Sequence, residues 1–235
     1  MLRVIILDFD GVVADSEPAH LAMFQRVLGE MDIFLSKEEY YANYLGYDDR
    51  GCFRTALIAK GRPADDDTVS ELVRRKAQAY LAYIQQNLRI YPGVKEFVAA
   101  AAKRYPLAIA SGALRQEIEW ILQEAGLWRA FAHITSAEDV AKGKPDPEIF
   151  LHALSGLNRR AGGSALQIVP DECLVIEDSI PGIRGAHAAG MKVLAVANTH
   201  GIEELHEADE VISSLERVRL PELEQKLWAL PSPQP

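Results

Sequence analysis

The sequence predicts an α/β protein: a doubly wound, Rossmann-like parallel sheet forms the core, and a helical cap domain is inserted into it. Four apolar runs of strand length support this prediction, at residues 4–7, 106–111, 172–178 and 192–198. They are rich in Val, Ile, Leu and Ala and lack polar alternation, which is typical of parallel strands covered on both faces. From about residue 90 onward these runs alternate with helical patterns, as a doubly wound sheet requires.

The first strand, VIIL at 4–7, leads directly into DFDGVVADSE at 8–17. Two aspartates, Asp8 and Asp10, therefore follow a segment that reads as fully buried. Carboxylates beside a core are costly unless they are paired, hydrogen-bonded or bound to a metal ion. The sequence thus predicts a compensating positive charge at this strand end.

Residues 17–88 interrupt the alternation of strands and helices. They contain helical patterns without an evident strand, and SELVRRKAQAYLAYIQ at 70–85 places its apolar residues on one stripe. We expect residues 17–88 to form a second, helical domain inserted into the first. Residues 1–16 and 89–235 would form the α/β core domain.

The elements after residue 90 follow in order. A helical pattern at 115–126 stops at Gly126, and 180–191 reads as a short crossover helix. Two weaker runs, at 133–137 and 208–213, are candidates for edge strands. The connection at 155–172 contains Arg159, Arg160 and a Gly-Gly pair, and we expect it to be a flexible surface insertion that enters the next strand at its amino end.

Composition narrows the partners of the protein. Its 235 residues carry a net charge of −9, which argues against nucleic acid because phosphate backbones are held by basic surfaces. The apolar run at the start is too short for a signal or a membrane span. Cys52 and Cys173 are too few and too far apart for a disulfide framework or a zinc site, so the cytoplasm is the expected location. We expect a monomer or a homodimer.

Candidate polar residues stand at the carboxyl ends of the first three strong strands, where open parallel sheets bind ligands. They are Asp8 and Asp10, then Ser111 and Gly112, then Glu177 and Asp178, with Lys142 and Lys144 after the run at 133–137. Clustered carboxylates attract a hard divalent cation, Mg²⁺ best, which also takes phosphate oxygens as ligands. A lysine and a hydroxyl suit the remaining phosphate oxygens, and an aspartate beside the metal can attack phosphorus.

Four motifs in this order resemble the haloacid dehalogenase superfamily, in the branch with a helical cap inserted after the first strand. DFDGVVADSE matches the first motif, ASG at 110–112 the second, GKPDPEIF at 143–150 the third and VIEDSIPGI at 175–183 the fourth. That branch contains phosphoglycolate phosphatases, sugar-phosphate phosphatases and β-phosphoglucomutases. The resemblance runs from residue 3 to about residue 213.

The resemblance implies a role for each matching residue. Asp8 would be the nucleophile, and Asp10 would protonate the leaving oxygen and then activate water. Ser111, Gly112 and Lys144 would bind the phosphoryl group, whereas Lys142 reads as a solvated neighbour. The Mg²⁺ ligands would come from Asp8, Asp10 through its backbone carbonyl, Asp178 and Glu177, with Glu177 either a direct ligand or a partner of one.

Three cap residues, His20, Arg50 and Lys76, occupy places that resemble substrate contacts in the mutase and related sugar-phosphate enzymes. Each also has a simpler interpretation. His20 reads equally well as a polar helix residue near the junction of the two domains, and Lys76 as a lysine that snorkels from the edge of an apolar stripe. Asp48 and Asp49 read as turn residues.

The resulting functional prediction is an Mg²⁺-dependent phosphatase that hydrolyses a small organic phosphate monoester, a sugar phosphate or a phosphoglycolate-like compound, through an aspartyl phosphate. The alternative is a β-phosphoglucomutase-type phosphomutase, toward which His20, Arg50 and Lys76 point. A phosphoacceptor signalling module is a remote alternative, because its phosphorylated aspartate lies on a different strand from its acidic pair. Here Asp8 and Asp10 follow the same strand.

Overall fold

The computed structural model describes residues 1–44, 47–160 and 167–228. In this part of the chain, a parallel sheet of six strands has the order β3-β2-β1-β4-β5-β6. The strands are β1 (Val4–Leu7), β2 (Leu107–Ala110), β3 (Phe131–Thr135), β4 (Cys173–Glu177), β5 (Lys192–Val196) and β6 (Glu210–Ile212). The four strong runs of the sequence are therefore strands, and the two weaker ones are β3 and β6 at the sheet edges, as predicted.

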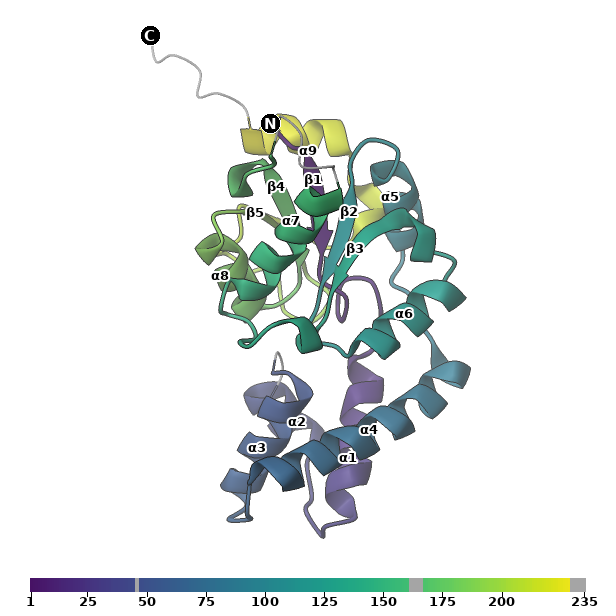
Figure 1. Cartoon of the computed structure of the whole chain (residues 1–235), viewed down its shortest axis with the longest axis vertical. Helices are drawn as coiled ribbons and strands as arrows, with labels where there is room; N and C mark the ends of the chain where they lie inside the picture. The colour runs from purple at the N-terminus through teal and green to yellow at the C-terminus, as the bar shows by residue number, and fades with distance from the viewer. Residues whose placement is uncertain (45–46, 161–166, 229–235) are drawn as a thin grey trace.

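Helices cover both faces of the sheet (Figure 1). Alternate strand residues point to opposite sides: Ile5 and Leu7 pack with one apolar cluster, and Val4 and Ile6 with the other. The first cluster includes residues of α5 (Val94–Ala101), α6 (Arg115–Glu124) and α9 (Leu220–Trp228), and the second includes residues of α7 (Glu148–Arg160) and α8 (Ile180–Ala188). This double cover explains why the strands lack polar alternation.

The cap consists of helices inserted between β1 and β2, beyond the carboxyl ends of the strands (Figure 1). They are α1 (Glu17–Gly29), α2 (Lys37–Asn43), α3 (Asp49–Ala59) and α4 (Asp66–Asn87). Ser36, Asp48 and Asp65 begin the last three helices, and each accepts a hydrogen bond from the backbone N–H three residues on. A separate apolar cluster, with Phe24 and Phe53 among its members, holds the four helices together.

The segment 155–172 differs from the prediction. Residues 155–160 are the last turns of α7, where Leu157 is buried, and Ile168 is buried as well. These apolar anchors pack against the sheet, so the segment is not an open surface insertion over its whole length. Residues 161–166, with the Gly-Gly pair, lie outside the described residues. The connection does enter β4 at its amino end, as expected.

Among the described residues, no helix combines the length and the apolar character needed to cross a bilayer.

Candidate active site

A cavity of about 270 Å³ lies between the carboxyl ends of the strands and the cap. Core residues that line it include Asp8, Asp10, Ser111, Gly112, Lys144 and Asp178. Cap residues that line it include Glu17, His20, Phe24, Tyr40, Asp48 and Asp49. Residues that are far apart in the sequence therefore meet at the carboxyl ends of the strands, as the strand-end rule for ligand binding by open parallel sheets predicts.

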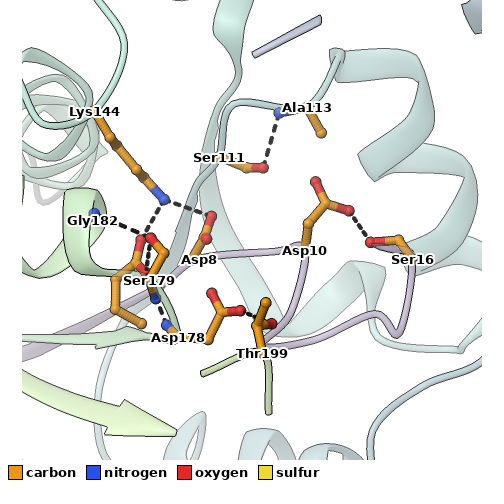
Figure 2. A network of polar contacts seen from close by, with 11 residues as sticks. Asp8, Asp10, Ser16, Ser111, Ala113, Lys144, Asp178, Ser179, Gly182 and Thr199 are labelled. Carbon is orange, nitrogen blue, oxygen red and sulfur yellow. Dashed lines mark hydrogen bonds and ion pairs between the residues drawn. The ribbon is translucent and has the colours of Figure 1, made fainter. Parts of the chain in front are cut away.

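Lys144 is the centre of an ion-pair network on the core side of the cavity (Figure 2). Its Nζ lies 2.8 Å from an oxygen of Asp8 and 2.6 Å from Oε1 of Glu177. Both acids are buried, and burial alone would lower the pKa of the lysine, but the two carboxylates raise it. Lys144 is therefore a fixed cation beside Asp8. Lys142, by contrast, extends into solvent, as predicted.

Asp8, Asp178 and Glu177 form a buried group that could hold a metal ion, because one oxygen of each lies within 4.8 Å of the others. Burial raises the pKa of Asp8 well above its usual range, and Glu177 adds to this effect while Lys144 opposes it. The pKa of Asp178 is raised by burial and by the charges of Glu177 and Asp8. One lysine thus does not compensate three close carboxylates, so the donor set fits a hard divalent cation.

Glu177 has more partners than the other two acids. Oε1 pairs with Lys144, and Oε2 accepts hydrogen bonds from the backbone N–H groups of Asp178 and Ser179 and from the Ser179 hydroxyl. Burial would raise the pKa of Glu177, but Lys144 and Ser179 lower it overall. This saturated carboxylate holds Lys144 and the turn after β4 in place.

Two residues that the sequence analysis did not select also contact the acidic group or the turn after β1. The Thr199 hydroxyl donates to Asp178, and Asn198 Nδ2 donates to the carbonyl oxygen of Gly11 at 2.7 Å (Figure 2 shows Thr199). Both follow β5, so the strand-end rule applied to the run at 192–198 would have found them. Gly11 has φ +79°, and a Cβ there would overlap the Asp178 carboxylate, so glycine is required.

Asp10 faces a different environment from Asp8. Its Oδ1 accepts a hydrogen bond from the Ser16 hydroxyl and lies 3.4 Å from His20 Nε2. Burial would raise the pKa of Asp10, but His20, Ser16 and Lys76 lower it overall. Two acids that are two residues apart thus have pKa values shifted in opposite directions.

Ser111 lies at the carboxyl end of β2, fully buried, with its hydroxyl oxygen accepting a hydrogen bond from the Ala113 N–H at 3.0 Å (Figure 2). Gly112 follows it, and both residues line the cavity. The hydroxyl hydrogen remains available for a ligand oxygen, because the oxygen is the acceptor in this turn.

Lys76 is completely buried, so the snorkelling interpretation is wrong. Its Nζ lies 2.5 Å from Asp49 Oδ1 and 2.6 Å from His20 Nδ1, and it lies over the rings of Phe24 and Tyr80. A buried lysine needs a counter-ion, and Asp49 supplies it. Asp49 is therefore more than a turn residue, whereas Asp48 does cap α3.

His20 connects this pair to Asp10. It is buried, stacks on Tyr80 and bridges Lys76 and Asp10. Burial and Lys76 would lower the pKa of His20, but Asp10 and Glu17 raise it overall. The structure thus links His20 and Lys76 to Asp10.

Of the three predicted cap residues, His20 lines the cavity, Lys76 contacts the cavity residues His20 and Asp49 from behind, and Arg50 does not reach the cavity. Its guanidinium donates to Ser70 at 3.0 Å and lies 3.7 Å from Asp66, both at the start of α4. Helix α3 begins at Asp49, and its first turn directs Asp49 inward and Arg50 outward.

Comparison with known proteins gives consistent results. A family model described as haloacid dehalogenase-like hydrolase matches residues 5–196. The chain is 31% identical over 162 residues to the chloroplastic 5-amino-6-(5-phospho-D-ribitylamino)uracil phosphatase of Arabidopsis thaliana. The aligned region covers 68% of this chain and 41% of that protein. The chain is also 28% identical over 195 residues to a phosphorylated carbohydrates phosphatase of Thermotoga maritima, and this aligned region covers 81% of this chain and 83% of that protein.

The chain spans less than half the length of the two Arabidopsis relatives that it matches. Among solved structures, a β-phosphoglucomutase from Clostridium difficile superposes with a TM-score of 0.84 at 21% identity, covering 97% of each chain. At that identity the likeness shows the fold alone. The family model, however, matches most of the sequence, and the chain therefore belongs to the haloacid dehalogenase-like hydrolase family.

Proposed function

We propose that the protein is an Mg²⁺-dependent phosphatase that hydrolyses a small organic phosphate monoester through an aspartyl phosphate on Asp8. The observation that supports this most is the contact of Lys144 with both Asp8 and Glu177, beside Asp178. It joins the first, third and fourth sequence motifs in one cavity. The relatives named as phosphatases agree with this reaction class.

The first half-reaction uses Asp8 as the nucleophile. A carboxylate oxygen of Asp8 attacks phosphorus, the bond from phosphorus to the ester oxygen breaks, and Asp10 gives its proton to the departing alcohol. Ser111, Gly112 and Lys144 bind the phosphoryl oxygens. In the second half-reaction, Asp10 removes a proton from water, which attacks phosphorus and releases Asp8 and inorganic phosphate.

Electrostatics explains the need for local cations. Two like unit charges about 4 Å apart repel by roughly 4 kcal/mol at an effective dielectric of 20. A phosphate dianion that approaches Asp8 meets this cost from several carboxylates, so Lys144 alone is insufficient. We propose that Mg²⁺, held by Asp8, Asp178 and the backbone carbonyl of Asp10, supplies the missing positive charge, with Glu177 holding Lys144 in position.

A phosphomutase is the second candidate, because His20 lies beside Asp10 and is itself in contact with Lys76, as expected for a cap that acts on the leaving group. A mutase returns the phosphoryl group to a sugar phosphate, so it must hold a second phosphate in the cap. Arg50, one of the cap residues expected to contact substrate, points away from the cavity. Hydrolysis is therefore the leading proposal.

The reaction is tested with small phosphate esters in the presence of Mg²⁺ or EDTA. We expect release of inorganic phosphate that depends on Mg²⁺, is lost with EDTA and returns when Mg²⁺ is restored. With β-glucose 1-phosphate, we expect inorganic phosphate and no glucose 6-phosphate. Turnover that EDTA leaves unchanged would contradict the metal assignment, and formation of glucose 6-phosphate would favour the mutase.

We also propose a cytoplasmic location and a small phosphorylated metabolite as the partner, with no role for nucleic acid. Cys52 and Cys173 are both unpaired and buried, as a reducing compartment favours.

A further inference from the structure

The two ends of the cavity differ in charge. At the phosphoryl end, Lys144 and the proposed metal ion face the carboxylates of the core. At the cap end, the leaving group would face Glu17, Asp48 and Asp49. From this difference we infer that the protein selects monophosphates whose leaving group carries no second anion and offers hydroxyl or ammonium donors; the inference rests on the proposed phosphatase function.

The cations of the cap do not neutralise this end. Lys76 is bound to Asp49 and His20, and Arg50 and Arg54 both pair with Asp66 away from the cavity. Among the described cap residues, no arginine or lysine lines the cavity. His20 does line it, but it is paired with Asp10. The cap end therefore has more carboxylates than cations.

These carboxylates retain the capacity to accept hydrogen bonds. Asp49 Oδ2 is buried and has no hydrogen-bond partner among the described residues, although Oδ1 is bound to Lys76. Glu17 accepts a hydrogen bond from the Tyr40 hydroxyl through Oε2 at 2.9 Å. Burial raises the pKa of Glu17, although His20 opposes this, which shows that nearby cations do not fully compensate its charge. A donor on the leaving group would satisfy these oxygens.

The remaining cap surface suits a polyhydroxylated carbon skeleton. Phe24, Tyr40 and Tyr47 line the cavity with aromatic rings, against which the C–H face of a sugar or an ammonium group can pack. Acceptors beside aromatic rings fit donors on an otherwise apolar skeleton. A carboxylate or second phosphate at the same place would meet like charge in a partly desolvated site.

This inference separates substrates that the proposed function alone treats as equal. Phosphoglycolate and sugar bisphosphates carry a second anion and should be poor substrates. Monophosphates of sugars, sugar alcohols and amino sugars should be good ones. It also favours hydrolysis over the mutase reaction, because transfer to a sugar phosphate would create a bisphosphate inside the cavity.

The test uses two matched pairs of esters as competitors of p-nitrophenyl phosphate hydrolysis. D-glucitol 6-phosphate and 6-phospho-D-gluconate differ only in a hydroxymethyl or carboxylate group at C1. Glucose 6-phosphate and glucosamine 6-phosphate differ only in a hydroxyl or ammonium group. We expect the gluconate ester to bind about tenfold or more weakly than the glucitol ester, and the glucosamine ester at least as tightly as the glucose ester.

Equal or tighter binding of the gluconate ester would overturn the inference while leaving the phosphatase proposal intact. Absence of turnover with every ester would instead contradict the phosphatase proposal. In that case calorimetric titration of the wild-type protein with the glucitol and gluconate esters still decides the charge preference.

Two conservative variants connect the preference to named residues. Asp48→Asn keeps an oxygen that accepts the Gly51 N–H, and Glu17→Gln keeps one that accepts the Tyr40 hydroxyl. Each should narrow the gap between the glucitol and gluconate esters by about threefold or more. Asp67→Asn, which removes an exposed carboxylate from α4 outside the cavity, is the matched control. An equal effect of Asp67→Asn would assign the preference to overall charge and overturn the local assignment.

Discussion

At the scale of single residues, Asp8 and Asp10 show how two identical side chains can take different roles. Asp8 is buried among acids, so its pKa is raised when no metal ion compensates the group. Asp10 lies against His20 and Ser16, so its pKa is lowered overall despite its burial. A cation beside Asp8 would favour the charged form that the proposed nucleophile needs, and the lowered pKa of Asp10 favours the charged form that the proposed base needs to take a proton from water.

Asp10→Asn should separate the two half-reactions. Asparagine can neither protonate the leaving oxygen nor take a proton from water, so steady-state phosphate release should fall by about 10²- to 10⁴-fold. Slow phosphorylation of Asp8 is the most that should remain, which intact-protein mass spectrometry after acid quenching would detect. Asp15→Asn is the matched control, because Asp15 does not line the cavity and contacts Tyr91. Turnover of Asp10→Asn within tenfold of wild type would contradict the assigned role.

The cap residues mark the limit of sequence reasoning at this scale. The core residues follow strand ends, where topology fixes their positions. The direction of a cap side chain depends on the register of helix packing, which a sequence pattern leaves open. Lys76 turned inward because Asp49 and His20 offered partners, and Arg50 turned outward to Ser70 and Asp66.

At the scale of elements, the turn from β4 into α8 depends on close packing of Glu177 under the first turn of the helix. A Cβ on Gly182 would overlap the Glu177 carboxylate, which holds Lys144. Glycine at this position thus connects helix packing to the position of Lys144, the proposed phosphate-binding residue.

Gly182→Ala should therefore lower activity by at least about tenfold and destabilise the fold by about 1–3 kcal/mol, the range for an overpacked buried site. The measurements are phosphate release and urea unfolding. Gly29→Ala is the matched control, because Gly29 ends α1 and a Cβ there would meet no atom of the described residues within 4 Å. Alanine at this position should be neutral or stabilise the helix by up to about 1 kcal/mol. Similar losses in both variants would refute the specific contact.

Helix α6 carries a buried acid of its own, Glu117, which faces the cap. Burial raises its pKa to about 7, with Lys76 and His20 opposing the shift and Asp49 and Asp10 adding to it. Within the described part of the chain, its Oε1 has no hydrogen-bond partner. Because the folded-state pKa is raised, the folded protein binds this proton more tightly than the unfolded chain does. The contribution of Glu117 to stability therefore falls as pH rises from about 4.5 to 7.

Glu117→Gln should remove that pH dependence. The free energy of unfolding of the variant minus that of wild type should therefore increase from pH 5 to pH 8 by on the order of 2–3 kcal/mol. Urea unfolding at both pH values measures this difference. Gln116→Ala, at an exposed uncharged neighbour, should change stability equally at both pH values. A difference between wild type and Glu117→Gln that stays constant with pH would contradict the buried, proton-binding state.

The strands were predictable because each buried parallel strand is a short apolar run. The end of α7 was not, because Arg159, Arg160 and the following glycines resemble a surface loop. The spacing of Ile149, Ala153 and Leu157, all buried on one face of α7, is the signal that indicates a helix through residue 157 and beyond.

At the scale of the whole molecule, a net charge of −9 sets a general repulsion against any phosphate ester. The fold overcomes it locally, because the parallel sheet brings Lys144 and the acids that could bind a metal ion to one strand-end cavity. The cap then covers this cavity with acidic and aromatic side chains. Order along the chain thus predicted which residues meet at the core end of the cavity, whereas the residues that the cap presents there depend on packing between core and cap.

The central claim is that Asp8 forms a covalent phosphoenzyme. The most direct measurement is acid quenching during turnover with Mg²⁺ and p-nitrophenyl phosphate, followed by peptide mass spectrometry of wild type and Asp8→Asn. We predict one phosphoryl group on Asp8 in wild type, and no phosphoryl group and no turnover in Asp8→Asn, whose circular dichroism and melting temperature should remain close to those of wild type. Near wild-type turnover by Asp8→Asn, or a phosphoryl group on another residue, would contradict the account.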